Sequence, residues 1–205
     1  MRHEDQIREV LIKNTISLVA KGGFEMATTK AIVYSGAVLD DVKLNEVHIY
    51  RVFGSKENLY AQAFRMLDEE IFVNGYRAAM VFADKETPAK ENFKKFFNSL
   101  WRFILGNEDK CRYYVRFYYS VYFRESAHRN HRENFANGIA LFKDQFKEEA
   151  DVRSLLHSTF TTLLDFAIRV YNGDLEDTQS NADHIFNLLY CSLMCYFKNS
   201  TMQLI

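Results

Sequence analysis

Proline occurs once in the 205 residues, at Pro88, and glycine occurs only eight times. These residues supply most tight turns between strands, so a chain that nearly lacks them favours long helices. No stretch shows the period of two that marks a half-buried strand, whereas apolar residues recur at helical spacing. The sequence therefore predicts an all-α fold. The predicted helices span residues 4–21, 29–38, 46–53, 56–83, 89–105, 109–124, 127–149, 152–171 and 179–199.

Three short helices precede the long ones and end at Gly54, after which Ser55 caps the next helix. Two helices joined by a turn, the second of them short and capped, have the layout of a helix-turn-helix. We therefore predict an N-terminal three-helix helix-turn-helix domain over residues 1–54. A larger helical domain is predicted over residues 55–205.

The second helix of such a pair enters the major groove of DNA. On that geometry Glu46, Val47 and His48 reach base edges. Tyr50 and Arg51 reach bases or backbone, and Lys56 holds a phosphate together with the free N–H groups of the next helix. The predicted DNA-binding residues are Thr28, Lys43, Asn45, Glu46, Val47, His48, Tyr50, Arg51 and Lys56.

Each of these residues also has a purely structural interpretation. Tyr50 fits as a packing residue between helices, Lys56 as a solvated residue at a helix start, and Thr28 as a cap alone. The charge balance counts against a simple electrostatic DNA binder, because residues 1–60 hold eight Lys and Arg against eight Asp and Glu.

Two stretches, AKGGFEMATTKAIV (residues 20–33) and LNEVHIYRVFGSKENLY (residues 44–60), carry a specific resemblance. They are similar to the DNA-binding segment of the tetracycline-repressor (TetR) family of bacterial transcriptional regulators. The matching positions are Gly23, Phe24, Thr28, Ile32, Leu44, Asn45, Ile49, Tyr50, Phe53, Ser55, Lys56, Glu57, Asn58 and Leu59. The resemblance covers about 40 residues. It implies a homodimeric, cytoplasmic repressor that binds a palindromic operator in double-stranded DNA and is released by a small-molecule effector.

Two features depart from the family pattern. The interval from Thr28 to Tyr50 is about six residues longer than usual, and the extra residues fall in the turn around AVLDDV. Val47 stands where a small glycine usually lets the helix approach DNA, and its neighbour Glu46 is acidic. These departures leave an alternative open, in which a TetR-like fold has lost DNA binding and binds only small molecules or proteins.

Aromatic residues crowd the middle of the chain, in FKKFFNSLWRFIL (residues 93–105) and YYVRFYYSVYF (residues 113–123). One interpretation is a well-filled core, and the other is a cavity for an apolar or aromatic compound. The resemblance implies an effector pocket among these helices. The predicted pocket residues are Phe97, Trp101, Tyr114, Phe117, Tyr118 and Phe166.

The last two predicted helices are more apolar than one buried face requires. They fit either a single-chain core or a four-helix bundle completed by a second copy, and the resemblance implies the dimer. The predicted interface residues are Leu156, Phe160, Leu163, Leu164, Ile185, Leu188, Leu189 and Leu193.

No pattern indicates catalysis or a bound cofactor. Glu125, His128 and His131 share a helical spacing that metal ligands use, but this single set lies among arginines, so we expect a solvated helix start and no metal. No nucleophile motif or phosphate loop occurs, which predicts that the chain is not an enzyme. The N-terminus lacks an apolar signal core, and no run of 18 apolar residues occurs. The three cysteines fit free thiols of a cytoplasmic protein.

Overall fold

The computed structural model describes residues 3–35, 44–84 and 86–198. Within these ranges the chain is helical and holds no strand, which confirms the predicted all-α fold; Phe146 and Phe197 form one isolated antiparallel bridge. The helices are α1 (His3–Gly22), α2 (Thr29–Tyr34), α3 (Val47–Phe53), α4 (Lys56–Ala79), η1 (Met80–Ala83), α5 (Ala89–Leu105), α6 (Glu108–Tyr118), α7 (Glu125–Phe142), η2 (Lys143–Gln145), α8 (Val152–Tyr171) and α9 (Gln179–Met194). No helix among the described residues combines the length and apolarity needed to cross a bilayer.

The chain forms two compact units, each built from two separate stretches of sequence. The first unit contains residues 1–70 and 107–132, and the second contains residues 71–106 and 133–205. Helices α4 and α7 therefore contribute residues to both units. The units are defined by packing, so the predicted functional boundary between residues 54 and 55 stays a prediction.

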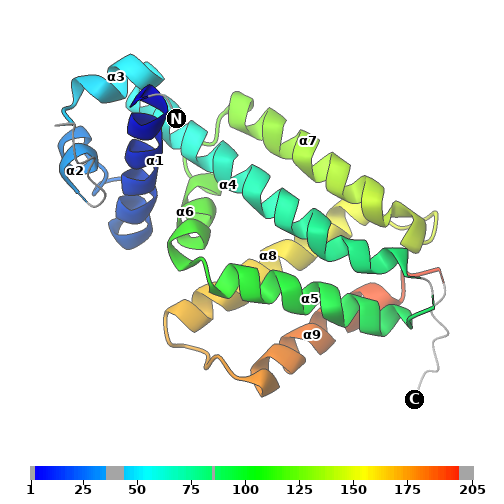
Figure 1. Ribbon diagram of the computed structural model, residues 1–205. Coiled ribbons are helices and arrows are strands. Elements are labelled where there is room, and N and C mark those ends of the chain that lie inside the picture. Colours follow the sequence, from blue (N-terminus) through cyan, green and yellow to red (C-terminus); the bar gives the residue numbers. More distant parts are fainter. Residues whose placement is uncertain (1–2, 36–43, 85, 199–205) are drawn as a thin grey trace. The chain divides into compact units, whose positions relative to one another are not determined.

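In the first unit α1 is the central helix and packs against α2, α3 and α6 (Figure 1). Its apolar side chains face inward at helical spacing, since Ile7 and Leu11 are fully buried one turn apart. The fully buried side chains of these partner helices and of α4 are Ile32, Ile49, Leu59, Tyr60, Phe64, Tyr113 and Phe117. This core fixes α2 and α3 on one side of α1.

Two glycines end helices of the first unit at positive φ, where other residues are strained. Gly23 follows α1 with a φ of 83°, and its N–H donates to the Val19 carbonyl at 2.9 Å. Gly54 follows α3 with a φ of 77°, and its N–H donates to the Tyr50 carbonyl at 2.9 Å. The sequence predicts both stops, because Gly22 and Gly23 follow the predicted helix 4–21 and Gly54 follows the predicted helix 46–53, and both are confirmed.

Helix α6 ends at Tyr118, so the prediction of a helix to residue 124 is wrong. The Ser120 hydroxyl donates to the Phe117 carbonyl at 2.8 Å and accepts from the Tyr122 N–H at 3.1 Å. Such side-chain bonds offer the backbone an alternative to the helix ladder. Helix α7 likewise ends at Phe142, before the predicted residue 149.

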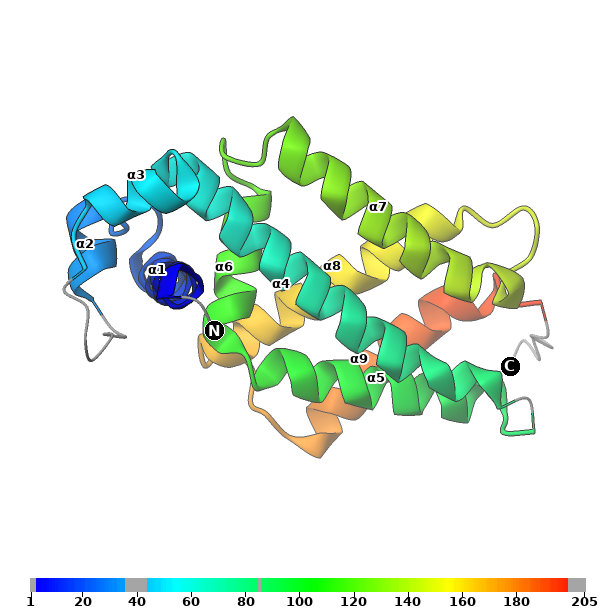
Figure 2. The ribbon, with the colours of Figure 1, turned by 45° about the horizontal axis from the view of Figure 1, so that its top comes forward.

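In the second unit α5, α8 and α9 pack on one another, as Figure 2 shows. The short loop at residues 172–178 joins α8 to α9, so these two helices run in opposite directions. Asp151 caps α8 by accepting from the Ser154 N–H, and Thr178 caps α9 by accepting from the Asn181 N–H. The core side chains between the three helices are Phe97, Trp101, Ile104, Leu163, Leu164, Ile185, Phe186 and Leu189.

Candidate nucleic-acid interface

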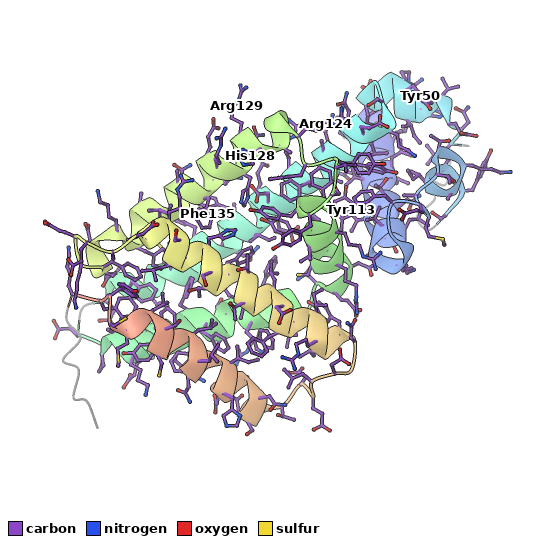
Figure 3. All side chains as sticks on the ribbon, turned by 180° about the vertical axis from the view of Figure 1, so that it is seen from behind. Tyr50, Tyr113, Arg124, His128, Arg129 and Phe135 are labelled. Atoms are coloured by element: carbon purple, nitrogen blue, oxygen red, sulfur yellow. The ribbon has the colours of Figure 1, made fainter. Side chains whose placement is uncertain are left out.

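Helix α3 has one buried face and one exposed face. Ile49, Val52 and Phe53 are buried in the first unit. Val47 and Tyr50 lie one turn apart on the other side, with 69% and 54% of their surfaces exposed. Figure 3 shows Tyr50 on the outer side of this helix. The structure therefore places the middle of the predicted DNA-binding set on one accessible surface.

The start of α3 is held by Asn45 and His48. The Asn45 Oδ1 accepts from the Val47 N–H at 3.1 Å, and His48 Nδ1 lies 3.1 Å from the Asn45 N–H. The formal cap position is Glu46, which makes no side-chain cap bond. The side-chain cap comes from Asn45, as the sequence predicts, although α3 begins at Val47 and not at the predicted residue 46. Because this contact engages His48 Nδ1, the predicted base contact of His48 would have to use Nε2.

Glu46 bonds to α2. The Thr29 hydroxyl donates a hydrogen bond to the Glu46 carboxylate, which joins the first residue of α2 to the entry of α3. Thr28 caps α2 as predicted, because its Oγ1 accepts from the Ala31 N–H at 3.1 Å. The Asn14 side chain donates to the Ile32 carbonyl at 2.9 Å and so fixes α2 to α1. These bonds set the spacing of the two helices of the candidate interface.

The start of α4 lies directly after α3. The Ser55 hydroxyl accepts from the Asn58 N–H at 3.1 Å, and the Lys56 ammonium lies 5.7 Å from the centre of the Tyr60 ring. Hydrogen bonds from the Glu57 backbone N–H and from Ser55 hold the pKa of the Glu57 carboxyl below its usual range. An acid in the first turn shows that this helix end favours negative charge. Lys43 lies outside the described residues.

Tyrosine hydroxyls connect this surface to α6. Tyr60 donates to the Ala27 carbonyl at 2.8 Å, and Tyr113 donates to the Tyr60 carbonyl at 2.8 Å. The Arg116 guanidinium reaches the Val19 carbonyl at 2.7 Å. Figure 3 shows Tyr113 inside the first unit. Helix α6 is therefore bonded both to α4 and to the end of α1.

A buried polar group joins α4, α6 and α7. Asp68 is 5% exposed, accepts from the Tyr114 hydroxyl at 3.1 Å, and lies 2.8 Å from His131 Nδ1. Burial, and next the charge of Asp68, raise the pKa of the Tyr114 hydroxyl well above its ordinary value. His131 thus faces inward to a carboxylate, whereas His128 is exposed with its ring against Phe123. Among the residues that the structure describes, no three His, Cys, Asp or Glu side chains are grouped to hold a metal ion.

The six predicted pocket residues divide between the two units. Tyr114, Phe117 and Tyr118 belong to the first unit, where Tyr114 and Phe117 stack on Phe64 at 4.9 and 4.7 Å between ring centres. Phe97, Trp101 and Phe166 belong to the second unit, where Phe97 and Trp101 are buried and stack at 6.1 Å. Each set packs within its own unit, and the pocket that we predicted from them stays a prediction.

The second unit holds a small aromatic cavity of about 80 Å³. It lies where α5 and α8 begin and where α7 and α9 end. Its lining contains none of the six predicted pocket residues. The cavity is lined by Phe82, Ala89, Phe93, Phe96, Phe142, Gln145, Phe146, Leu156, Thr159, Tyr190, Leu193 and Phe197.

Most of the predicted interface residues lie inside the second unit. The buried ones are Leu163, Leu164, Ile185, Leu189 and Leu193. Leu156 and Phe160 are half-buried, and Leu156 and Leu193 also line the aromatic cavity. Leu188 is 54% exposed, so it is the member of the set whose side chain is most available to a second chain.

Several residues that shape the candidate interface were missed by the sequence analysis. Arg8 bonds to the Gln62 side chain, and its guanidinium lies 5.1 Å from the centre of the Phe53 ring, at the end of α3. Tyr34, the last residue of α2, is 64% exposed. The pairing of Thr29 with Glu46 was also missed. No local pattern marks such contacts, because they join residues 17 to 54 positions apart.

Comparison with known proteins adds a fold relationship at low sequence identity. No family model and no curated protein matches the chain. A TetR family regulator from Marinobacter aquaeolei VT8 aligns with a TM-score of 0.73 and 18% identity, over 94% of this chain and 98% of that one. A putative TetR family regulator from Shewanella sp. PV-4 aligns with a TM-score of 0.68 and 13% identity, over 91% and 97% of the two chains. The multidrug binding protein EbrR, solved with imidazole, aligns at 0.61 and 15%, over 89% and 93%.

Proposed function

From the TetR fold that these structures share with the chain, we propose that this protein is a DNA-binding transcriptional regulator. Helix α3 enters the major groove of one half of a palindromic operator. The observation that carries this proposal is the outward face of α3. Two large side chains of a seven-residue helix, Val47 and Tyr50, are more than half exposed on it. Exposed apolar side chains that lie together on one face can contribute to an interaction surface.

The ends of α3 support the same role. Asn45 and His48 fix its first turn, Gly54 stops it, and its inward side chains are buried. A helix restrained in this way docks without first becoming ordered, which lowers the entropic cost of binding. Val47 and Tyr50 then contact base edges or the thymine methyl group.

The start of α4 supplies the phosphate contact. Its first N–H groups and the Lys56 ammonium sit one residue beyond Ser55, where a helix end favours an anion. Arg51, exposed on α3, adds a second cation near the backbone. Lys56 binds as a point charge, so its removal weakens binding to all sequences alike.

The regulation follows the family pattern. The protein acts as a homodimeric repressor in the cytoplasm and dissociates from DNA when a small apolar or aromatic effector binds. Such an effector shifts the equilibrium between two dimer states in which the two α3 helices are differently spaced, and it must bind one state more tightly. The chain is not an enzyme and needs no cofactor.

A second candidate function is a TetR-fold binding module without DNA. The observation in its favour is Glu46, an acid beside the proposed groove-binding face. The hydrogen bond from the Thr29 hydroxyl holds the Glu46 carboxylate toward α2, which reduces the repulsion that this acid would exert on DNA phosphates. A carboxylate in that position also accepts a hydrogen bond from a cytosine amino group.

Selection of bound sequences from random double-stranded DNA tests the proposal directly. The protein is expected to enrich a palindrome whose half-sites are one helical turn apart, or a multiple of it. Lys56→Ala should lower the slope of log affinity against log salt concentration by about one. Tyr50→Ala should lower the affinity for the selected site more than the affinity for random DNA. Lys95→Ala and Tyr76→Ala, exposed residues of the second unit, serve as matched controls. A selection that enriches no sequence would contradict the DNA-binding proposal and support the second candidate.

A further inference from the structure

The aromatic cavity of the second unit has no part in the proposed DNA binding, and its walls are formed by aromatic rings in mutual contact. Phe82, Phe96 and Phe142 form a triangle with ring centres 5.3 to 5.7 Å apart. Phe93 extends this wall, since its ring centre lies 6.1 Å from that of Phe96 and 5.7 Å from that of Tyr190. These spacings are those of favourable aromatic pairs, so the walls are mutually supported and keep their shape.

A backbone clasp closes one end of the cavity. Phe146 and Phe197 pair as an isolated bridge, with their rings 4.9 Å apart. The Lys147 N–H donates to the Tyr196 carbonyl at 2.9 Å, and the Lys198 N–H donates to the Gln145 carbonyl at 3.0 Å. The clasp joins the segment after η2 to the segment after α9. It therefore holds Phe146 and Phe197 in place as part of the lining.

The lining carries no charge near neutral pH. Tyr190 is its ionisable member, and burial raises the pKa of that hydroxyl, which keeps it protonated. Lys90 lies 5.6 Å from the centre of the Tyr190 ring, but Lys90 is exposed and its charge is hydrated. A charged ligand in this cavity would lose its own hydration, and no charged side chain belongs to the lining to compensate that loss.

Two polar groups are set into the aromatic lining. The Thr159 hydroxyl donates to the Leu155 carbonyl at 2.8 Å, so its remaining lone pairs are placed to accept. The Gln145 carboxamide offers both a donor and an acceptor. A few polar groups in an apolar pocket fix the orientation of a ligand and provide its specificity.

We propose that this cavity binds a small neutral compound that combines one aromatic ring, or a short aliphatic chain, with a hydroxyl or N–H donor. The ring enters among the phenylalanines, and its donor meets Thr159 or Gln145. About 80 Å³ is smaller than the ~150 Å³ apolar cavity that admits benzene, so a ring enters only in part and its remainder lies at the mouth, beside the exposed Ala89. A ligand larger than one ring must extend past Ala89 into solvent. This ligand class deepens the proposed function, on which its role as an effector rests.

Methyl NMR of the full-length protein without DNA tests the site, with benzyl alcohol, benzoate and benzylammonium as probes. Benzyl alcohol is expected to shift the methyl signals of Leu156 and Leu193, which line the cavity, and to bind at least tenfold more tightly than either charged analogue. Equal or tighter binding of benzoate or benzylammonium would overturn the neutral class. Absence of any shift at Leu156 and Leu193 would overturn the site.

Three variants make the test specific. Ala89 is exposed and lines the cavity, so Ala89→Phe should close the mouth of the cavity. The affinity for benzyl alcohol should then fall at least tenfold. Ser99→Phe, the same enlargement at an exposed α5 position outside the lining, should leave binding unchanged. Thr159→Val keeps the shape and removes the acceptor, so the preference for benzyl alcohol over toluene should fall severalfold. Unchanged binding in Ala89→Phe would contradict the proposal. These measurements use no DNA, so they test ligand binding in the cavity whether or not the DNA selection succeeds.

Discussion

At the scale of single residues, tyrosine hydroxyls determine how the first unit is held together. Tyr60, Tyr113 and Tyr114 are all buried, and each donates its hydroxyl to a named acceptor. Burial raises the pKa of all three hydroxyls above the ordinary value near 10. Such groups couple stability to pH at the alkaline end.

We therefore predict that the free energy of unfolding falls steeply above about pH 10. The folded-state pKa lies above the unfolded one, so the stabilising effect is complete below the unfolded pKa and is lost as pH rises toward the folded pKa. Urea unfolding between pH 8 and pH 11 measures this loss. Tyr113→Phe should reduce the alkaline slope, although it lowers stability at pH 8 by about 1 kcal/mol through the lost hydrogen bond. An unchanged slope in Tyr113→Phe would contradict the assignment.

Residue roles differ in how far the sequence predicts them. The cap at Thr28 and the stops at Gly23 and Gly54 are local features, and the structure has them where we expected. The contact of Thr29 with Glu46 joins two helices across the turn, and Asp68 meets His131 across 63 positions. These pairs arise from packing, so no spacing rule within one helix predicts them.

At the scale of elements, helix existence was more predictable than helix ends. Every predicted helix overlaps an observed one, because amphipathic periodicity extends over many residues. The ends of α6 and α7 were misplaced because single hydroxyl or loop contacts decide them. The second helix ends at Tyr34, where Ser35 adopts an extended backbone, so the prediction of a helix to residue 38 is wrong.

The end of α3 gives a prediction for the candidate interface. Gly54 has a φ of 77°, and a Cβ there would meet Asn58 Nδ2 at 3.7 Å, so space is available and backbone strain alone opposes substitution. Gly54→Ala should destabilise the protein by about 1 to 2 kcal/mol and weaken operator binding, because α3 must shift at its end.

Gly75→Ala is the matched control for this change. Gly75 lies inside α4, and a Cβ there meets no atom within 4 Å. The substitution should stabilise the protein by about 0.5 to 1 kcal/mol and leave DNA binding unchanged. Urea unfolding and DNA titration measure both variants. If Gly54→Ala and Gly75→Ala destabilised the protein by similar amounts, the positive φ of Gly54 would not be what opposes its substitution.

At the scale of the whole molecule, fewer residues of α8 and α9 are accessible to a second subunit than the eight interface residues predicted from the sequence. Runs of leucine in α8 and α9 fit both a single-chain core and a shared bundle. Burial of Leu163, Leu164 and Ile185 favours the single-chain core at those three positions. Leu188 remains accessible on α9, and Cys191 is exposed three residues later on the same face.

Leu188→Lys is accordingly expected to separate the proposed dimer while leaving each subunit folded. Sedimentation at micromolar concentration should show monomers with unchanged helical circular dichroism, and Cys191 should react faster with maleimide than in the wild-type dimer. Leu164→Lys is the control, because a charge at this buried site should unfold the chain instead. A dimer joined through this face gains affinity for a palindrome by holding two α3 helices together, so the Leu188→Lys variant should bind the full operator no more tightly than a half-site. If the variant stays dimeric, the partner helix packs elsewhere on the chain.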